Sequence, residues 1–414
     1  MKLRALIQFL LSLATILGLA SIMSAGISAG MSAGISAGIS AGGGGAMTAG
    51  MTLGTPDIKS GGPMAFGPEG ILFMGDTQGA AVFAIDLKDR VNNTVSKPMD
   101  IIGIDKKLAA MLGTTPDGIL INDLAVNPIS QNIYLSVSRR TGRLGFDPIP
   151  IYPVSRLIAA DSAPVLIKVT KKGALEEVPL IKVMFSKAML SNQFKPDAKI
   201  ESLWGEAQWQ LTITHLAYVD GQLFVAGLSN EEFSSTLRRL TFPFKQGGEQ
   251  TTGLEVFHTA HGRYETRAPI DTFLPFQIKG KPVVLAAYGC TPLAVFPLDE
   301  MKQKKQMRGK TIAELGSGNQ PIDMISFKRD GKEYILISNT NRSMMRISAE
   351  DIERAEPITT PVKESNQTVG VKYVPIAGAG VLQLDKLNDQ FVVIINRDLQ
   401  TGWLNMRTTP MDHF

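Results

Sequence analysis

Residues 61–86, GGPMAFGPEGILFMGDTQGAAVFAID, contain three short apolar runs separated by turn residues. The runs cover Pro63–Phe66, Ile71–Met74 and Ala81–Asp86, and Gly67-Pro68-Glu69-Gly70 separates the first two. Short apolar runs that are bounded by Gly, Pro and Asp are typical of β-strands joined by tight turns. This stretch therefore predicts three consecutive antiparallel strands.

The same pattern of apolar runs and turn residues, called the blade phrase below, recurs five more times along the chain. The copies are Ile121–Ser136, Ile213–Gly227, Pro269–Gly289, Pro321–Asn339 and Gly380–Asn396. Their strands are apolar at nearly every residue, which is typical of sheets buried on both faces. Internal repeats of this kind predict a radial arrangement of sheets. We therefore expect an all-β β-propeller of six blades, while the long interval between the second and third copies leaves room for a seventh.

The N-terminal residues indicate export. Lys2 and Arg4 precede the uncharged, mostly apolar run Ala5–Ala20, the pattern of a cleaved signal peptide over residues 1–20. No charge occurs between Ala5 and Pro56, so hydropathy alone leaves an uncleaved anchor as the alternative, and any membrane contact would go through this leader. Residues 21–52 read as a Ser/Ala/Gly tether rather than a helix-packing face. The expected location is periplasmic or extracellular.

The predicted propeller spans residues 53–414 and carries two insertions. The insertions are Arg139–Pro164, between the second and third strands of blade two, and Ser186–Trp209, before blade three. Blade six has no fourth strand of its own before the chain ends. We expect Met51–Lys59 to supply that strand, so that N- and C-terminal strands pair, close the ring and leave no exposed edge.

Charge and cysteine content restrict the classes of partner. The 414 residues are 44% hydrophobic and 19% charged, with a net charge of +4, so nothing electrostatic points to a nucleic acid. Cys290 is the single cysteine, which excludes an intrachain disulfide. A protein or polymer partner agrees with this composition.

One column of the aligned copies carries polar groups. The residue at the start of the first strand is Pro63 in the first copy, and in later copies it is Asp123, His215, Asp271 or Asp323. Because the first strand of each blade lines the channel of a propeller, these four later residues should form a ring at one channel mouth. Carboxylates suit Ca²⁺, Mg²⁺ or Mn²⁺, and an added His admits Zn²⁺, so a divalent cation is the candidate cofactor.

A structural role is the alternative for this column. Asp at a strand start can accept hydrogen bonds from nearby backbone N–H groups, and water in the channel can solvate the remaining oxygens. Elsewhere, His258 and His261 are three residues apart and should point to opposite faces of a strand, which argues against a metal pair. The sequence has no GxSxG, HExxH, P-loop or CxxCH motif.

The blade phrase resembles that of the NHL and gluconolactonase-like class of β-propellers, best at Phe66–Asp76 (FGPEGILFMGD). The resemblance covers the chain from Leu53 to Phe414 as architecture. It implies a six-bladed propeller, and in metal-dependent lactonases of the class Glu, Asn and Asp hold a cation in the channel. In this chain Asp123, Asp271 and Asp323 suggest a comparable place. Fold alone does not determine function.

Two functions follow from these observations. The first is an exported, non-catalytic scaffold that binds a protein, peptide or polymer on its loop face, favoured by the tether and the insertions. The second is a metal-dependent enzyme at the channel mouth, a lactonase-like hydrolase or an oxidoreductase, in which the metal lowers the pKa of a bound water.

Overall fold

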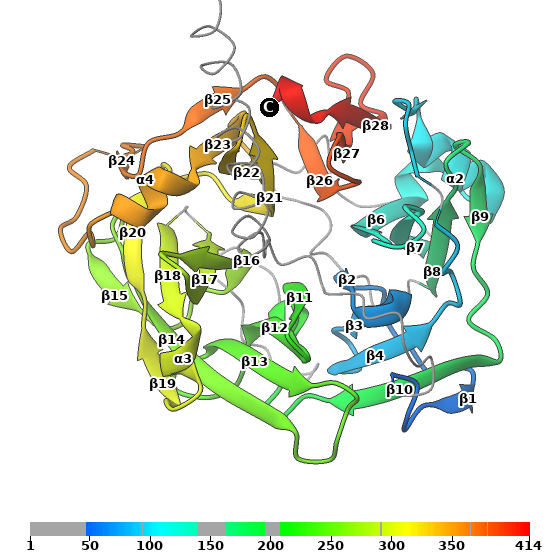
Figure 1. The fold of residues 1–414 in the computed structure, drawn as a ribbon, viewed down its shortest axis with the longest axis horizontal. Coiled ribbons are helices and arrows are strands. Elements are labelled where there is room, and N and C mark those ends of the chain that lie inside the picture. The colour runs from blue at the N-terminus through cyan, green and yellow to red at the C-terminus, as the bar shows by residue number, and fades with distance from the viewer. Residues whose placement is uncertain are drawn as a thin grey trace, which may run out of the picture. The chain divides into compact units, whose positions relative to one another are not determined.

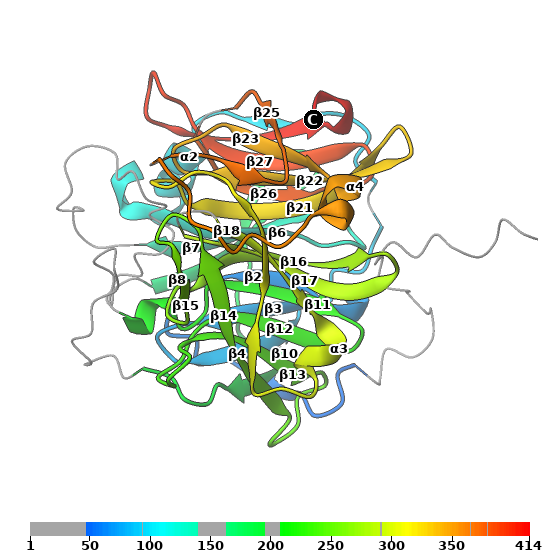
Figure 2. The ribbon, with the colours of Figure 1, turned by 90° about the vertical axis from the view of Figure 1, so that its left-hand side faces the viewer.

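The copies of the blade phrase fold as separate sheets, and the sheets are arranged in a ring (Figure 1). The structure is a computed structural model that describes residues 47–92, 94–139, 163–194, 208–289, 292–364, 366–378 and 380–414. Within these ranges the strands form six sheets, which confirms the predicted six-bladed β-propeller. In the side view of Figure 2, strands of neighbouring blades cross the molecule in stacked layers. The predicted leader and most of the tether lie outside the described residues.

Blade one contains residues 61–86, the stretch with three apolar runs. Its inner strands are β2 (Met64–Phe66), β3 (Ile71–Asp76) and β4 (Ala81–Asp86), and every residue of β3 and β4 is buried. Its outer strands come from elsewhere in the chain. β10 (Val183–Met189) pairs with β4, and β1 (Thr52–Gly54) pairs with β10. The predicted insertion Ser186–Trp209 therefore begins inside a strand of blade one.

The other five blades each begin next to the axis and continue outward in chain order, except for the outermost strand of blade six. Blade two has β6 (Ile119–Val126), β7 (Ile133–Arg139), β8 (Ala163–Val169) and β9 (Leu175–Glu177). Blade three has β11 (His215–Val219), β12 (Gln222–Leu228), β13 (Ser235–Thr241) and β14 (Glu249–His258), extended by β15 (Arg263–Glu265) and β19 (Gln306–Arg308). Blade four has β16 (Ile270–Ile278), β17 (Lys281–Tyr288), β18 (Pro292–Pro297), β20 (Lys310–Glu314) and β24 (Val369–Gly370).

Blades five and six have four strands each. Blade five has β21 (Pro321–Arg329), β22 (Lys332–Asn339), β23 (Met344–Ser348) and β25 (Val374–Ile376). Blade six has β26 (Val381–Lys386), β27 (Phe391–Arg397), β28 (Leu404–Pro410) and β5 (Asp100–Ile101). The described residues also form short α-helices, which are α2 (Ile104–Leu112), α3 (Leu298–Met301) and α4 (Ala349–Arg354). The 3₁₀ turns are η1 (Pro68–Gly70), η2 (Pro116–Gly118), η4 (Gln208–Leu211) and η5 (Met411–His413).

Three inner hairpins have the turn that their sequences predict. The two central residues of each turn have positive φ angles, as a type I′ turn requires. They are Asp220 (48°) and Gly221 (78°), Lys279 (50°) and Gly280 (74°), and Asp330 (52°) and Gly331 (73°).

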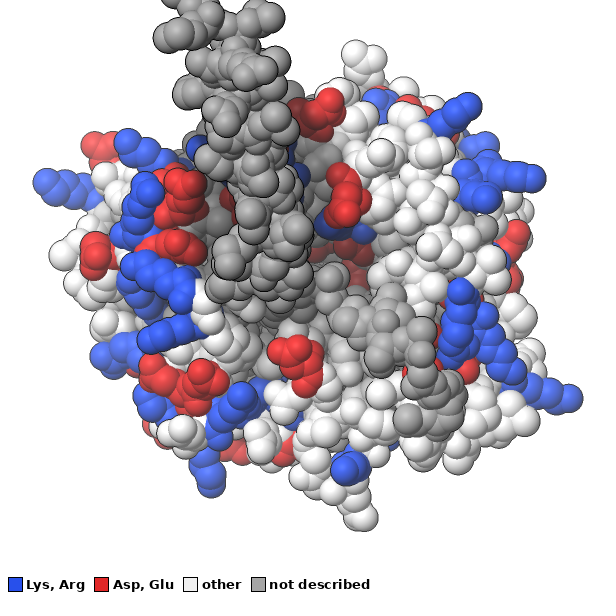
Figure 3. All heavy atoms as spheres, viewed as in Figure 1, with Lys and Arg blue, Asp and Glu red and all other residues white. Residues whose placement is uncertain are grey.

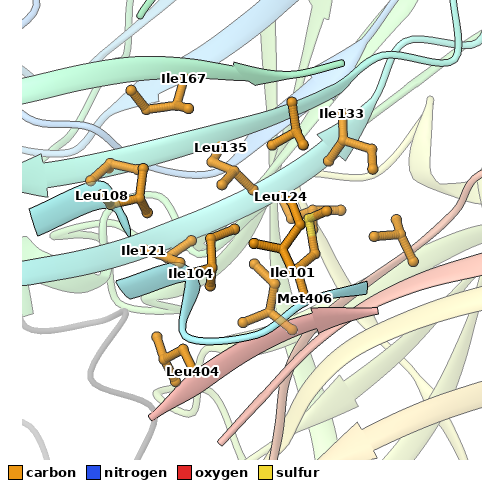
Figure 4. Packing of buried hydrophobic residues seen from close by; sticks show 14 of the residues in the cluster. Ile101, Ile104, Leu108, Ile121, Leu124, Ile133, Leu135, Ile167, Leu404 and Met406 are labelled. Atoms are coloured by element: carbon orange, nitrogen blue, oxygen red, sulfur yellow. The ribbon is translucent and has the colours of Figure 1, made fainter. Parts of the chain in front are cut away.

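The order of the blades around the ring differs from their order in the chain. The inner strand of blade two lies between those of blades six and one, and the inner strand of blade one is next to that of blade three. Figure 4 shows how blades six and two pack: Leu404 and Met406 of β28 meet Ile121 and Leu124 of β6, with α2 alongside. The ring therefore runs one, three, four, five, six, two.

The last blade is completed by a strand from the N-terminal third of the chain. β5 pairs with β28, with Ile101 opposite Met406. The prediction that Met51–Lys59 supplies this strand is wrong, because Thr52–Gly54 pairs with β10 in blade one instead. β5 lies between blades one and two in the chain. The segment that connects these two blades therefore supplies the outermost strand of blade six.

No helix in the described part of the chain has both the length and the apolar character that crossing a membrane requires.

Candidate functional site

The four residues predicted to form a ring all line one cavity at the axis. Asp123, His215, Asp271 and Asp323 surround a volume of about 50 Å³, which has room for water or an ion. The rest of its lining comes from the same inner strands and their approaches: Gly62, Pro63, Asn122, Gln210, Leu211, Ile213, Thr214, Ile322 and Gln383.

A β-bulge sets the position of these side chains. The pairing of the inner strand shifts by one residue in blades two, four, five and six, at the same level of each. The residue after the bulge is Asp123 in blade two, Thr272 in blade four and Asp323 in blade five. Asp271 lies within the bulge, so its predicted equivalence with the other two aspartates is wrong by one residue. A bulge adds one residue to one strand, which a sequence alignment of hairpins does not show.

Three aspartates of the inner strands join neighbouring blades. Each accepts one backbone N–H from the adjacent blade and a second from the residue that follows it. The bonds between blades are Met64 N to Asp123 Oδ2 (2.5 Å), Leu384 N to Asp323 Oδ2 (3.0 Å) and Val126 N to Asp385 Oδ2 (2.8 Å). The local bonds come from Leu124 N (2.8 Å), Met324 N (2.8 Å) and Lys386 N (2.6 Å). The geometry thus supports the structural role that the sequence left open, and it places the three bonds at consecutive junctions of the ring.

Asp385 belongs to this group and was missed from the sequence. It lies two residues beyond Gln383 on β26, whereas the sequence alignment considered only the start of each strand. Its local signal was an aspartate near the end of β26, after the apolar Leu384.

These three carboxyls are harder to ionise than ordinary aspartates. Burial raises the pKa of Asp123 to about 7 and that of Asp385 to about 6, although the backbone N–H groups pull both pKa values down. Burial, followed by the negative charge of Asp123 and Asp385, raises the pKa of Asp323 well above its usual range. Mutual repulsion between buried carboxylates is one of the three ways in which proteins shift a pKa.

His215 gives the cavity a neutral imidazole. Its Nδ1 lies 3.5 Å from Thr272 Oγ1 of blade four, and its ring meets Phe273 edge-on with centroids 5.0 Å apart. The side chain is half-buried. Burial disfavours the charged imidazolium and lowers the pKa of His215 to about 4. At neutral pH the ring therefore carries a lone pair that can accept a hydrogen bond or bind a metal.

A second, larger cavity lies between blades one and two. This cleft has a volume of about 240 Å³ and begins one residue from the channel cavity, at Gly61. Most of the residues that line it have apolar side chains. They come from three segments, Pro56 and Ile58 before blade one, Pro164 to Leu166 of β8, and Val178 to Ile181 after β9, with Met74, Ser136 and Glu177.

One polar atom in the cleft has no hydrogen-bond partner within the described residues. Ser136 is fully buried, and its Oγ makes no hydrogen bond there. A buried hydroxyl without a partner costs free energy, which a polar group of a bound ligand can recover. The cleft thus combines apolar walls with one buried donor and acceptor, as ligand pockets do.

His258 and His261 lie together, contrary to the prediction that they point to opposite faces. His258 ends β14, and the chain turns over the next four residues, so the alternation of a strand does not apply there. Nδ1 of His258 lies 2.8 Å from one oxygen of Glu265, and Nδ1 of His261 lies 2.9 Å from the other. The two imidazole centroids are 4.0 Å apart.

The comparisons with known proteins identify no family. A scan against protein-family models found no match, and a search of curated proteins found none either. Among solved structures, an arabinanase of Bacillus subtilis is 12% identical, with 70% of this chain and 94% of that chain covered and a TM-score of 0.33. The extracellular domain of a one-component system from B. thetaiotaomicron is 8% identical, with 86% and 39% covered and a TM-score of 0.33.

A protein from Lactobacillus plantarum is 13% identical to this chain, with 84% of this chain and 83% of that chain covered and a TM-score of 0.29. Likenesses at these TM-scores carry no argument about function. The propeller fold rests on the six sheets themselves.

Proposed function

We propose that this protein is an exported propeller that acts as a binding module, and that its partner is a protein, peptide or polymer that inserts an apolar group into the cleft between blades one and two. The observation that carries the proposal is the cleft itself, with its apolar walls, its volume of about 240 Å³ and the buried Ser136 hydroxyl. Membership of the gluconolactonase-like class stays a prediction from the blade phrase.

The size of the cleft favours part of a larger partner over a free metabolite. Pockets for drug-sized ligands have volumes of about 300–1,000 Å³, whereas an apolar cavity of about 150 Å³ already admits benzene. A cleft of 240 Å³ thus suits one aromatic or branched aliphatic side chain. The channel cavity, at about 50 Å³, is too small for either.

The position of the cleft also favours a macromolecular partner. Arg139 and Ala163, between which the predicted insertion leaves and rejoins blade two, pair with each other at the end of β7. Pro164 and Val165, the next two residues, line the cleft. A partner seated in the cleft would therefore lie next to the point where the predicted insertion rejoins blade two.

The face seen in Figure 3 carries charged side chains of both signs. In Figure 3, basic and acidic side chains are interspersed along the left-hand rim, where β14, β15 and β20 lie in Figure 1. Mixed charge of this kind keeps a protein soluble and does not by itself recruit a charged partner.

The first test uses Ile181, which is 66% exposed at the rim of the cleft. Ile181→Asp places a charge where the partner's apolar group must enter. Burial of one Ile side chain is worth about 1.5–3 kcal/mol, so partner retention should fall about tenfold or more. The measurement is quantitative pull-down from the native cell or its medium.

The matched control is Leu399→Asp. Leu399 is 73% exposed in the turn between β27 and β28, on blade six. It should retain the same partner as the wild-type protein. Equal retention by wild type, Ile181→Asp and Leu399→Asp would count against the cleft as the contact site.

A divalent cation at the channel mouth is the second candidate. It is favoured by the convergence of Asp123, His215, Asp271 and Asp323 on one cavity, and by a neutral imidazole there. A metal so held could activate a water for a lactonase-like or redox reaction. The hydrogen bonds that Asp123 and Asp323 accept reduce the lone pairs available to it.

Elemental analysis of the purified protein tests this candidate. If a cation is held, we expect about one Ca, Mg, Mn or Zn per chain in the wild type and a loss of most of it in Asp271→Ala. The control is Asp299→Ala, which removes an exposed aspartate that does not line the channel cavity. A wild-type protein without stoichiometric metal would exclude the enzyme that depends on it.

A further inference from the structure

A small hairpin at the outer edge of blade three brings two histidines and a glutamate onto one side. β14 ends at His258, and β15 returns antiparallel with Arg263 opposite His258. Glu265 is two residues farther along β15, so it lies on the same face as Arg263 and His258. The turn between the strands is closed by a hydrogen bond from His261 N to His258 O (3.1 Å), which returns His261 to that face.

The opposite face of the hairpin holds it in place. Phe257 and Tyr264 pack edge-to-face with centroids 5.2 Å apart. The guanidinium of Arg308 lies 3.9 Å above the Tyr264 ring and is paired with Glu255 at 2.5 Å. The histidine–glutamate cluster (His258, His261 and Glu265) therefore has a support that does not depend on a ligand.

The ligand atoms of the cluster are close enough to share one ion. They all lie within 4.8 Å of one another, the only group of three such residues found in the described part of the chain. In a tetrahedral zinc site with bonds of about 2.0–2.1 Å, neighbouring ligand atoms are about 3.3 Å apart. The Nδ1 atoms of His258 and His261 lie 2.8 and 2.9 Å from the two different oxygens of Glu265. For a carboxylate that binds through both oxygens, each of these distances needs to lengthen by only about 0.5 Å to reach that spacing.

The exposure of the three side chains suits a site that an ion can enter. His258 is 3% exposed and Glu265 is 10% exposed, whereas His261 is 35% exposed and lies at the entrance. We propose that the histidine–glutamate cluster binds one divalent transition-metal ion of the Zn²⁺ class through the imidazoles of His258 and His261 and the carboxylate of Glu265. Two histidines and one glutamate form a ligand set that Zn²⁺ accepts with a fourth position open to water.

Arg263 competes with the ion for Glu265. Its Nε donates to the same carboxylate oxygen as His261, at 2.9 Å. The side chain is 70% exposed, so it can leave for solvent at little cost. Removal of the Arg263 guanidinium should therefore tighten metal binding. Such tightening is not expected if the cluster is only a hydrogen-bonded support for the turn.

The test is calorimetric titration of the full chain with ZnCl₂ after treatment with a chelator. The wild type should bind one Zn²⁺ per chain at this site. His261→Ala should weaken binding by at least about tenfold, as should Glu265→Gln, and Arg263→Gln should strengthen it. The matched control is His413→Ala, which removes an exposed histidine at the other end of the chain.

Co²⁺ in place of Zn²⁺ supplies a readout that does not depend on affinity, because its visible absorption reports the coordination geometry. Loss of the tetrahedral signal in His261→Ala, with the signal kept in His413→Ala and in Asp271→Ala, would support the site and separate it from the channel cavity. His261 is partly exposed, so this variant should fold. Absence of Zn²⁺ binding to the wild type, or equal weakening by His413→Ala and His261→Ala, would overturn the proposal.

Discussion

Replacing Phe73 with alanine is expected to lower the free energy of unfolding by about 3–5 kcal/mol, the usual cost of removing a buried aromatic ring. Phe73 is fully buried in β3 of blade one. It stacks on Tyr218 of blade three at 5.4 Å and meets Phe242 edge-on at 4.9 Å. Its removal would leave a cavity at the junction of two blades, where Gly67 already approaches the ring too closely for any larger residue.

Chemical denaturation of Phe73→Ala measures this loss. A double-mutant cycle with Tyr218→Ala then tests the blade order, because aromatic neighbours couple by about 0.5–1.5 kcal/mol beyond burial. The matched pair is Phe73 with Tyr334, which belongs to blade five and should show no coupling. Coupling to Tyr334 but not to Tyr218 would refute the adjacency of blades one and three.

Asp323→Ala is expected to cost about 2–4 kcal/mol, because it leaves two buried backbone N–H groups without an acceptor at about 1–3 kcal/mol each. The groups are Met324 N within the strand and Leu384 N in the next blade. Part of the loss is offset, since the change also removes the repulsion between Asp323 and its neighbours Asp123 and Asp385.

Equilibrium unfolding in the presence of a chelator is the appropriate measurement. If the aspartate joins the blades directly, the destabilisation should persist without metal, and Asp299→Ala, at a side chain 72% exposed, should change stability by less than about 0.5 kcal/mol. A loss that disappears once metal is removed from both proteins would instead assign Asp323 to a cation.

The architecture was predictable because its signals are local. Apolar runs of strand length and the turn residues between them are properties of neighbouring residues, and the three type I′ turns occur at Asp-Gly or Lys-Gly pairs between such runs.

The order of the blades was not predictable, because it depends on contacts between distant residues. Nothing in the spacing of the copies shows that β10 returns to blade one after blade two is complete. β5 is only two residues long, so its pairing with β28 leaves no periodic pattern to read. The packing of Ile101 against Met406 appears only in the folded ring (Figure 4).

The site residues were predictable in type and less so in position. The sequence identified Asp123 and Asp323, but the bulge in β16 displaced Asp271 from their column. It missed Asp385, which lies farther along its strand. It separated His258 from His261, because strand alternation was assumed to continue where the chain turns. Bulges and turns change the direction of side chains without a strong change in composition.

The central claim is that the cleft between blades one and two holds an apolar part of a partner. The most direct measurement places a photo-crosslinking amino acid at Ile181 in the native cell and compares it with the same amino acid at Leu399. We predict one discrete crosslinked product at Ile181, no such product at Leu399, and loss of the product when Val178 in the cleft wall is changed to Asp. No product at Ile181, or the same product from both positions, would contradict the claim.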